Sequence, residues 1–384
     1  MATKIVTSGK WETIPFLSCL QKVSVGRDKQ IKQKEYMQSG LFPVIDQGQS
    51  FIAGYTNDKN KVISDIQPFI IFGDHTRILK YIDFPIALGA DGTKVIKPKD
   101  NFDTKFFYFF LKNLDIPNRG YNRHFTILKE KNILQPSLPE QKSIAHVLTV
   151  IQDAIAGQEE LIAKLKELKK SMMQHLFTHG TKGEKTKMTE IGEMPEGWNV
   201  VELGDVCNRK NEQSLPNQAG SRIYVGLEHL EPGEANVGKY GLESEVKSSK
   251  VIFNSGDTLY GKLRPYLDKA AIPNFDGLAS TDIIVLNGES ISNKFLVALL
   301  HTEDFLKYAK QTTSGVNHPR TSWESIRKYK FALPDKKQQE SMQEAYWAII
   351  EKIEAAQEKL SNYQNLFKTL LHELMSGERR INKI

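Results

Sequence analysis

One pattern of apolar residues occurs twice in this chain, and it limits the folds open to it. In the first copy, side chains recur at alternating steps of four and three residues over about five heptads. Its ten positions are Ile144, Leu148, Ile151, Ile155, Gln158, Ile162, Leu165, Lys169, Met172 and Leu176. Adding 198 to each number gives the second copy, Met342, Tyr346, Ile349, Ile353, Ala356, Leu360, Tyr363, Phe367, Leu370 and Leu374. We call these twenty positions the seam, and such a stripe is typical of a coiled-coil helix.

Each copy of the seam follows a signal for the start of a helix. Ser137 and Glu140 form an S-x-x-E capping box, and Asp335 and Gln338, 198 residues later, form it as D-x-x-Q. The sequence therefore predicts one long helix over 137–178 and a second within 335–384, followed by a C-terminal tail.

Two arrangements of these helices are open. They could be unrelated amphipathic helices in separate cores, but the shared register favours helices that pack on each other, antiparallel. Each would be about 60 Å long, at roughly 1.5 Å per residue. A rod of that length does not fill a globular core, so we expect it to hold two parts of the chain apart.

The remaining sequence predicts two globular parts with a common beginning. Trp11 opens residues 1–136, and Trp198, 187 residues later, opens residues 197–334. Residues 179–196 contain Gly, Pro and charged residues without a period, which is typical of a surface linker. A chain of 384 residues has room for two domains and their connections.

Both globular parts have mixed secondary structure. Runs of β-branched and aromatic residues between Gly, Pro and Asp predict strands. They lie at 42–45, 69–72, 94–96, 222–227, 258–259 and 283–286. Residues 104–114 predict a short buried helix, although this aromatic run also fits a strand, and a helix is predicted near 293–310. The expected class is α+β: two mixed α/β domains, related by an internal pseudo-twofold repeat and joined by two long antiparallel coiled-coil helices.

Composition adds weaker limits. No apolar run approaches membrane-spanning length, the N-terminus lacks a signal-peptide core, and two cysteines give no disulfide framework, so we expect a cytoplasmic protein and no membrane. The net charge of +6 is a mild bias toward nucleic acid. Residues 1–136 carry 20 basic and 13 acidic side chains, whereas residues 197–333 carry 16 of each. A nucleic-acid site in the second part would therefore depend on local clustering.

The motifs of several enzyme classes are missing. The sequence has no Pro-Pro pair for the amine-binding loop of amino-group DNA methyltransferases, no Gly-rich dinucleotide loop and no phosphate loop. Glu245 and Lys247 form a nuclease-like E-x-K, but Glu167 and Lys169 repeat it inside the seam helix. His175 and His179 have zinc-compatible spacing without further ligands. We therefore predict no catalytic residue and no metal site.

Polar loops supply candidate DNA contacts in both parts. They combine Gly, basic residues, Asn, His and Tyr, and Arg and Asn can read guanine and adenine in the major groove. In the first part the candidates are Asp74, His75, Thr76, Arg77, Thr93, Lys94, Arg119, Tyr121, Asn122, Arg123 and His124. In the second they are Tyr260, Lys262, Arg264, Tyr266, Asn317, His318 and Arg320. Each loop could instead be a solvated turn, but a Gly-basic-Asn-His loop recurs shortly before both long helices.

Three stretches accompany the duplicated layout: PSLPEQKSIA at 136–145, IGEMPEGW at 191–198 and GDTLYGKLRPYL at 256–267. In this layout and in these stretches the chain resembles, over nearly its whole length, the specificity subunit of type I restriction–modification systems. The chain departs from the family pattern twice. The first half lacks the Pro-x-Gly before Trp11, and residues 334–338 read PDKKQ where Pro-Glu-Gln is usual.

The resemblance implies two target recognition domains, each reading one half of a split, asymmetric DNA site. It implies that the two helices set the spacer and dock two modification subunits, which bring S-adenosylmethionine, and that two restriction subunits, with ATP and Mg, complete the nuclease. It implies no catalysis and no cofactor in this chain. Independently, DNA has a turn of roughly 34–36 Å, so domains at the ends of the rod could face half-sites about one turn apart. A solo enzyme and a coiled-coil protein-binding scaffold without a DNA role are the alternatives.

Overall fold

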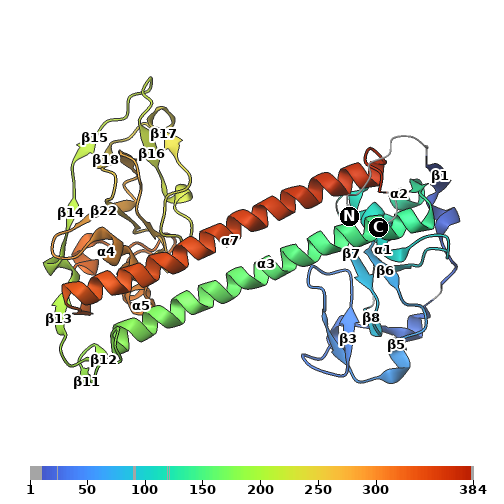
Figure 1. Cartoon of the computed structure of the whole chain (residues 1–384), viewed down its shortest axis with the longest axis horizontal. Coiled ribbons are helices and arrows are strands. Elements are labelled where there is room, and N and C mark those ends of the chain that lie inside the picture. Colours follow the sequence, from blue (N-terminus) through green and yellow to red (C-terminus); the bar gives the residue numbers. More distant parts are fainter. Residues whose placement is uncertain (1–10, 24, 90–91, 119, 121, 382–384) are drawn as a thin grey trace. The chain divides into compact units, whose positions relative to one another are not determined.

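A computed structural model of the chain describes residues 11–23, 25–89, 92–118, 120 and 122–381 (Figure 1). Its contacts divide the chain into two compact units. Unit 1 comprises Met1–Gly157 with Leu360–Ile384, and unit 2 comprises Gln158–Lys359. Each unit therefore contains one globular part and a stretch of both long helices.

The two long helices are α3 (Leu138–His179) and α7 (Lys336–Ser376), so the prediction of two long helices is confirmed. Within each unit a stretch of α3 runs beside an oppositely directed stretch of α7 (Figure 1). In unit 1, Ile144 and Leu148 share a core with Leu371 and Leu374. All twenty seam positions are buried or half-buried, as a packed helix pair requires.

The predicted capping boxes are half right. Asp335 caps its helix, because its Oδ1 accepts from the backbone N of Gln338 at 2.9 Å. The box also predicts that the residue three positions on bonds back to the cap. Instead, the side chains of Glu140 and Gln338 each accept a hydrogen bond from a tryptophan, and this part of the prediction is wrong.

The globular part of unit 1 has three sheets. Their strands are β1 (Glu12–Pro15), β2 (Gln30–Ile31), β3 (Phe42–Ile45), β4 (Gly54–Thr56), β5 (Val62–Ile63), β6 (Phe69–Gly73), β7 (Leu79–Ile82), β8 (Ile86–Gly89), β9 (Thr93–Ile96) and β10 (Asn132–Gln135). The orders are β2-β8-β3-β4 with β5 also on β8, β7-β6-β9, and β1-β10. Residues 104–114, for which a strand was possible, form helix α1 (Thr104–Asn113), and α2 (Phe125–Lys129) follows. Four phenylalanines of α1 lie in the core because apolar residues occupy nearly its whole length.

The globular part of unit 2 is built in a related way to that of unit 1, with more strands. Its strands are β11 (Thr186–Thr189), β12 (Gly192–Pro195), β13 (Asn199–Glu202), β14 (Cys207–Lys210), β15 (Gln213–Ser214), β16 (Ile223–Val225), β17 (Gly241–Leu242), β18 (Lys250–Phe253), β19 (Thr258–Gly261), β20 (Ala270–Ala271), β21 (Gly277–Ala279), β22 (Ile283–Gly288) and β23 (Lys330–Leu333). The orders are β14-β22-β19-β20, β15-β18-β21-β16-β17, β13-β23 and β11-β12. The helix expected near 293–310 is two helices, α4 (Asn293–Leu300) and α5 (Glu303–Gln311), because Thr302 caps a new start. A short α6 (Trp323–Ile326) precedes β23.

The predicted linker at 179–196 is more ordered than expected. Its strands β11 and β12 form an antiparallel hairpin with Glu190 and Ile191 between them. Met194 of β12 is buried in the core of unit 2, so the hairpin is part of that unit. The sequence hides it because only two neighbouring apolar residues, Met194 and Pro195, are buried and the hairpin shows little alternation.

The two ends of each globular part meet at the start of a long helix. In unit 1, β1 pairs antiparallel with β10, just before α3. In unit 2, β13 pairs in the same way with β23, just before α7. These equivalent strand pairs connect each globular part rigidly to its helices.

Candidate nucleic-acid interface

The three polar loops predicted in unit 1 meet at Asp74. The backbone N of Asp74 donates to Gly92 O at 2.6 Å, which joins the loop after β6 to the loop before β9. The backbone N of His124 donates to Asp74 O at 2.8 Å, and that of Phe125 donates to Asp74 Oδ1 at 2.8 Å. The segment before α2 is thereby held against the other two loops.

Three of the predicted contacts in unit 1 are buried and serve the fold. Asp74 is 3% exposed, Thr93 is 8% exposed and His124 is fully buried. Nδ1 of His124 lies 2.9 Å from Asp74 O, and the Asp74 carboxylate holds the start of α2. Since these residues leave at most 8% of their surface open to a ligand, we correct their assignment from DNA contacts to parts of the fold.

The other predicted residues of unit 1 lie on or near the surface. Thr76, Asn122 and Arg123 are exposed, while His75, Arg77 and Lys94 are half-buried. Nη1 of Arg77 donates to Ile116 O at 2.9 Å. The backbone of Arg77 has a positive φ of 62°. Two further predicted residues, Arg119 and Tyr121, lie outside the described residues.

In unit 2 the two predicted stretches lie side by side. The backbone N of Arg264 donates to Pro319 O at 2.7 Å, and that of Thr321 donates to Lys262 O at 3.0 Å. Leu263 and Arg320 form an antiparallel bridge between them. The fold therefore makes one surface from segments that are far apart in the sequence, since the bridged residues are 57 positions apart (320 − 263).

One prediction in unit 2 needs revision. Tyr260 is 1% exposed and packs edge-on against Phe305 in the core, so it is a core residue and cannot contact DNA here. The guanidinium of Arg320 is paired with Asp282, with Nε–Oδ1 at 2.8 Å and Nη2–Oδ2 at 3.2 Å. Because of this bond the pKa of the Asp282 carboxyl lies below its usual value. Lys262 is half-buried, while Arg264, Tyr266, Asn317 and His318 are exposed.

The two surfaces share one backbone construction. In each unit a strand ends in glycine, Gly73 or Gly261, and the carbonyl of the next residue accepts a hydrogen bond from a residue just before a short helix. Each also has an arginine with positive φ, 62° at Arg77 and 51° at Arg264. The frame is thus repeated, whereas the exposed side chains differ.

Comparison with known proteins identifies the family. The model of the type I restriction modification DNA specificity domain matches residues 19–167 and 195–366. The chain belongs to this family. The match occurs twice, once over each globular part, so we call these parts target recognition domains 1 and 2.

Named relatives and a solved structure agree. The chain is 26% identical over 275 residues to the type I restriction enzyme MjaVIII specificity subunit of Methanocaldococcus jannaschii, covering 67% of this chain but 64% of that one, less than two thirds of its length. It is 23% identical over 311 residues to the EcoDI specificity subunit of Escherichia coli, covering 72% and 70%. The fold is similar to that of the type I S subunit from M. genitalium, with a TM-score of 0.64 at 16% identity over 98% of this chain and 99% of that one.

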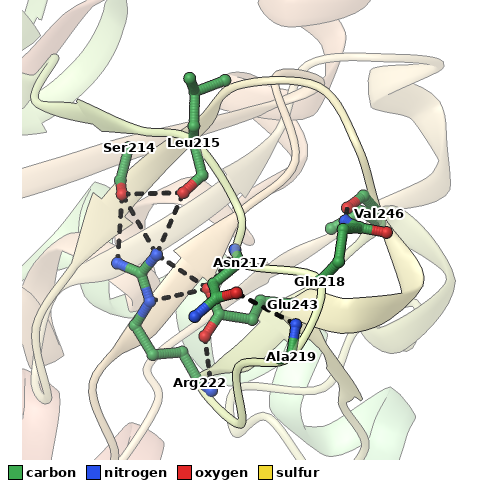
Figure 2. Close-up of polar contacts among 8 residues, drawn as sticks. All are labelled: Ser214, Leu215, Asn217, Gln218, Ala219, Arg222, Glu243 and Val246. Atoms are coloured by element: carbon green, nitrogen blue, oxygen red, sulfur yellow. Dashed lines mark hydrogen bonds and ion pairs between the residues drawn. The ribbon is translucent and has the colours of Figure 1, made fainter.

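One loop of target recognition domain 2 was missed in the sequence. Figure 2 shows residues 214–222 held by the carboxylate of Glu243, which is 2% exposed. It accepts from the backbone N of Asn217 at 3.0 Å and from Arg222 Nε at 2.9 Å, and Arg222 Nη2 reaches Leu215 O at 3.2 Å. Chiefly the Arg222 hydrogen bond lowers the pKa of Glu243 to about 2. No local pattern reveals this, because the two charged residues are 21 positions apart.

A joint between each domain and its helices was also missed. Nε1 of Trp198 donates to Gln338 Oε1 at 2.8 Å, and Nε1 of Trp11 donates to Glu140 Oε2 at 3.3 Å. The residue that follows each of these acceptors in its helix also makes an equivalent bond in both units. The side-chain amides of Gln141 and Gln339 each donate to a proline carbonyl at 2.9 Å. The repeat could have suggested these pairs, because the two tryptophans are 187 residues apart and their two acceptors are 198 residues apart.

The segments after the long helices complete both joints. After α7, Arg380 donates to both carboxylate oxygens of Glu140, at 2.6 and 2.8 Å. After α3, Glu184 accepts from the side-chain amide of Gln338. In each unit, the start of one long helix is thus bonded to the segment that follows the other.

A cavity of about 810 Å³ lies in unit 2 between α3, α5 and the β11–β12 hairpin. Of the polar groups along it, Lys169 Nζ donates to Gly233 O at 2.8 Å, and Nδ1 of His301 lies 2.6 Å from Asp268 Oδ1. The bond from Lys169 ties the domain to α3, and the contact of His301 with Asp268 lies within the domain. Among the described residues, no group of three His, Cys, Asp or Glu side chains is arranged to hold a metal ion, and no helix is long and apolar enough to cross a membrane.

Proposed function

We propose that this chain is the DNA sequence-specificity subunit of a type I restriction–modification complex. Each target recognition domain reads one half of a bipartite asymmetric site, and α3 and α7 set the spacer between the halves. The observation that carries the proposal is the repeated loop frame at Gly73 and Gly261, with different exposed side chains on each copy. Two similar frames with different side chains suit two different half-sites.

The exposed chemistry of both domains fits DNA. Domain 1 offers Asn122 and Arg123, and domain 2 offers Arg264 and Asn317, whereas the hydroxyl of Thr76 already donates to Gln47 O at 2.7 Å. Arginine can pair with guanine and asparagine with adenine in the major groove, while backbone amides suit phosphates. Since these groups sit on loops fixed by backbone hydrogen bonds, little conformational entropy is lost when they bind.

We further propose the partners and the division of labour. Two modification subunits dock on the helices and supply S-adenosylmethionine and the methyl transfer, and two restriction subunits supply the ATP- and Mg-dependent cleavage. This chain itself contributes no catalytic residue and acts in the cytoplasm. The names of the relatives, which are specificity subunits, support this division.

Methylation mapping tests the proposal. The chain would be co-expressed with the methyltransferase encoded beside it in a methylation-free host, and modified adenines would be mapped by long-read sequencing. One split motif with a fixed gap is the expected result. An unsplit motif would mean that one domain alone reads DNA, and a stable complex with an active partner but no methylation would favour the protein-binding scaffold.

A further inference from the structure

Residues 314–320 of target recognition domain 2 form a narrow hairpin with a fixed base. Ser314 and Arg320 exchange both backbone hydrogen bonds, at 2.9 Å each. The Arg320–Asp282 pair and the bond from Arg264 N to Pro319 O attach this base to the domain. Gly315, with φ 91°, provides the turn that a side chain would strain. The tip, residues 315–319, therefore projects from a rigid support.

The outermost side chain of this tip is apolar. Val316 is 98% exposed, the highest exposure among the large apolar side chains that the structure describes. A β-branched side chain has few rotamers, so its two methyl groups are held in a small region. Val316 stands next to Asn317 and His318, which are exposed as well. Val316 makes no contribution to the core that would explain an apolar residue at this position.

We infer that Val316 contacts the 5-methyl group of a thymine in the half-site read by domain 2. This inference rests on the proposed function. The major groove, about 12 Å wide, admits a two-stranded ribbon, and this hairpin, closed by one antiparallel bridge, is no wider at its base. Thymine alone presents a methyl group there, and apolar side chains recognise it. The neighbouring Asn317 and His318 offer hydrogen-bonding groups to adjacent base edges, so the tip can read apolar and polar features together.

The test removes the methyl group from the DNA and the two γ-methyl groups of Val316 from the protein. Once the motif is mapped, duplexes are made in which deoxyuridine replaces each thymine of both half-sites in turn. Their affinity is measured for the complete methyltransferase complex containing the wild-type chain, Val316→Ala or Met188→Ala. Met188 is a matched control, because it is 78% exposed in unit 2 but lies on the β11–β12 hairpin.

We expect one thymine of one half-site at which uracil weakens wild-type binding about fourfold, as for one buried methyl group. Val316→Ala should bind the thymine and uracil duplexes equally at that position, while Met188→Ala behaves as the wild type. The inference is overturned if Val316→Ala keeps every uracil effect, or if no thymine shows one. Weaker assembly with the methyltransferase and unchanged DNA discrimination would overturn it too, in favour of a protein contact. If the wild-type complex shows no sequence-specific binding at all, the proposed function itself fails.

Discussion

Gln158 and Ala356 meet across the two long helices: Nε2 of Gln158 donates to the carbonyl oxygen of Ala356 at 3.2 Å. They are 198 residues apart, so each occupies the other's position in the repeat. A pair of equivalent residues can meet in this way only near the axis that relates the two copies. Gln158, one of the two polar residues in the first copy of the seam, thus marks the centre of the helix pair.

The first prediction concerns this buried amide, which is 8% exposed. Gln158→Leu fills the same space with an apolar side chain and should change the free energy of unfolding by less than about 1 kcal/mol. Gln158→Ala leaves a gap and should cost about 2 kcal/mol. Urea unfolding measures both. An equal loss for Leu and Ala would mean that the hydrogen bond, which both variants lack, is what the seam needs, and not packing.

The second prediction concerns the joint at Trp198, which is 3% exposed. Gln338→Leu removes the acceptor of its indole N–H and leaves a buried donor without a bond, so it should lower the free energy of unfolding by about 1–3 kcal/mol. Tryptophan fluorescence during urea unfolding reports the change. Gln174→Leu, at an exposed position of α3, is the control. Equal midpoints for the two variants would contradict a structural role of the joint.

The third prediction is a pH dependence at the loop shown in Figure 2. The pKa of Glu243 is lowered to about 2 in the folded chain, so the folded state binds fewer protons here than the unfolded state between about pH 4.5 and 2. The stabilisation is therefore complete above about pH 4.5 and is lost as the pH falls toward 2. Glu243→Gln should lower the melting temperature at pH 7, and the difference from the wild type should shrink through that range. A difference that is constant with pH would exclude the ionised carboxylate as its cause.

The fourth prediction concerns the exposed cations. Charge reversal at Arg123, Lys262 and Arg264, each alone, should weaken DNA binding by the methyltransferase complex, because phosphate contacts release counterions. The slope of log K against log salt should fall by about one for each contact removed. Lys185→Glu, in the segment after α3, is the control of equal charge change. If all four variants lose affinity equally, net charge and not position is responsible.

Much of the fold could be predicted from the sequence, because its helices and strands follow from local patterns of apolar residues. The seam repeats every three or four residues, and the runs at 69–72 and 283–286 are short apolar stretches; the structure has long helices at the first and strands at the second. For the candidate interface, the sequence predicted only the separate segments. Asp74 and Arg123 look alike as polar loop residues, and only the burial of the first separates an anchor from a surface group.

The residues that were missed have long-range partners. Glu243 binds Arg222 across 21 residues, and Trp198 binds Gln338 across 140. No helix or strand propensity and no local pattern predicts such a bond, because the two partners are neighbours only in the folded chain. The repeat is the exception, since a pair found in one unit predicts its counterpart in the other.

The last prediction tests the helices as the ruler of the DNA site. α3 and α7 each pass from one unit into the other, at Gly157 and at Lys359. Inserting one heptad into both helices at these points keeps the seam in phase and adds about 10 Å. At about 3.4 Å per base pair, the unread spacer should lengthen by about three base pairs while both half-sites stay the same. Methylation mapping of the variant complex measures both. A spacer of unchanged length in an active complex would mean that the partner subunits, rather than the helices, set the distance, whereas altered half-sites would mean that the insertion disturbs the domains themselves.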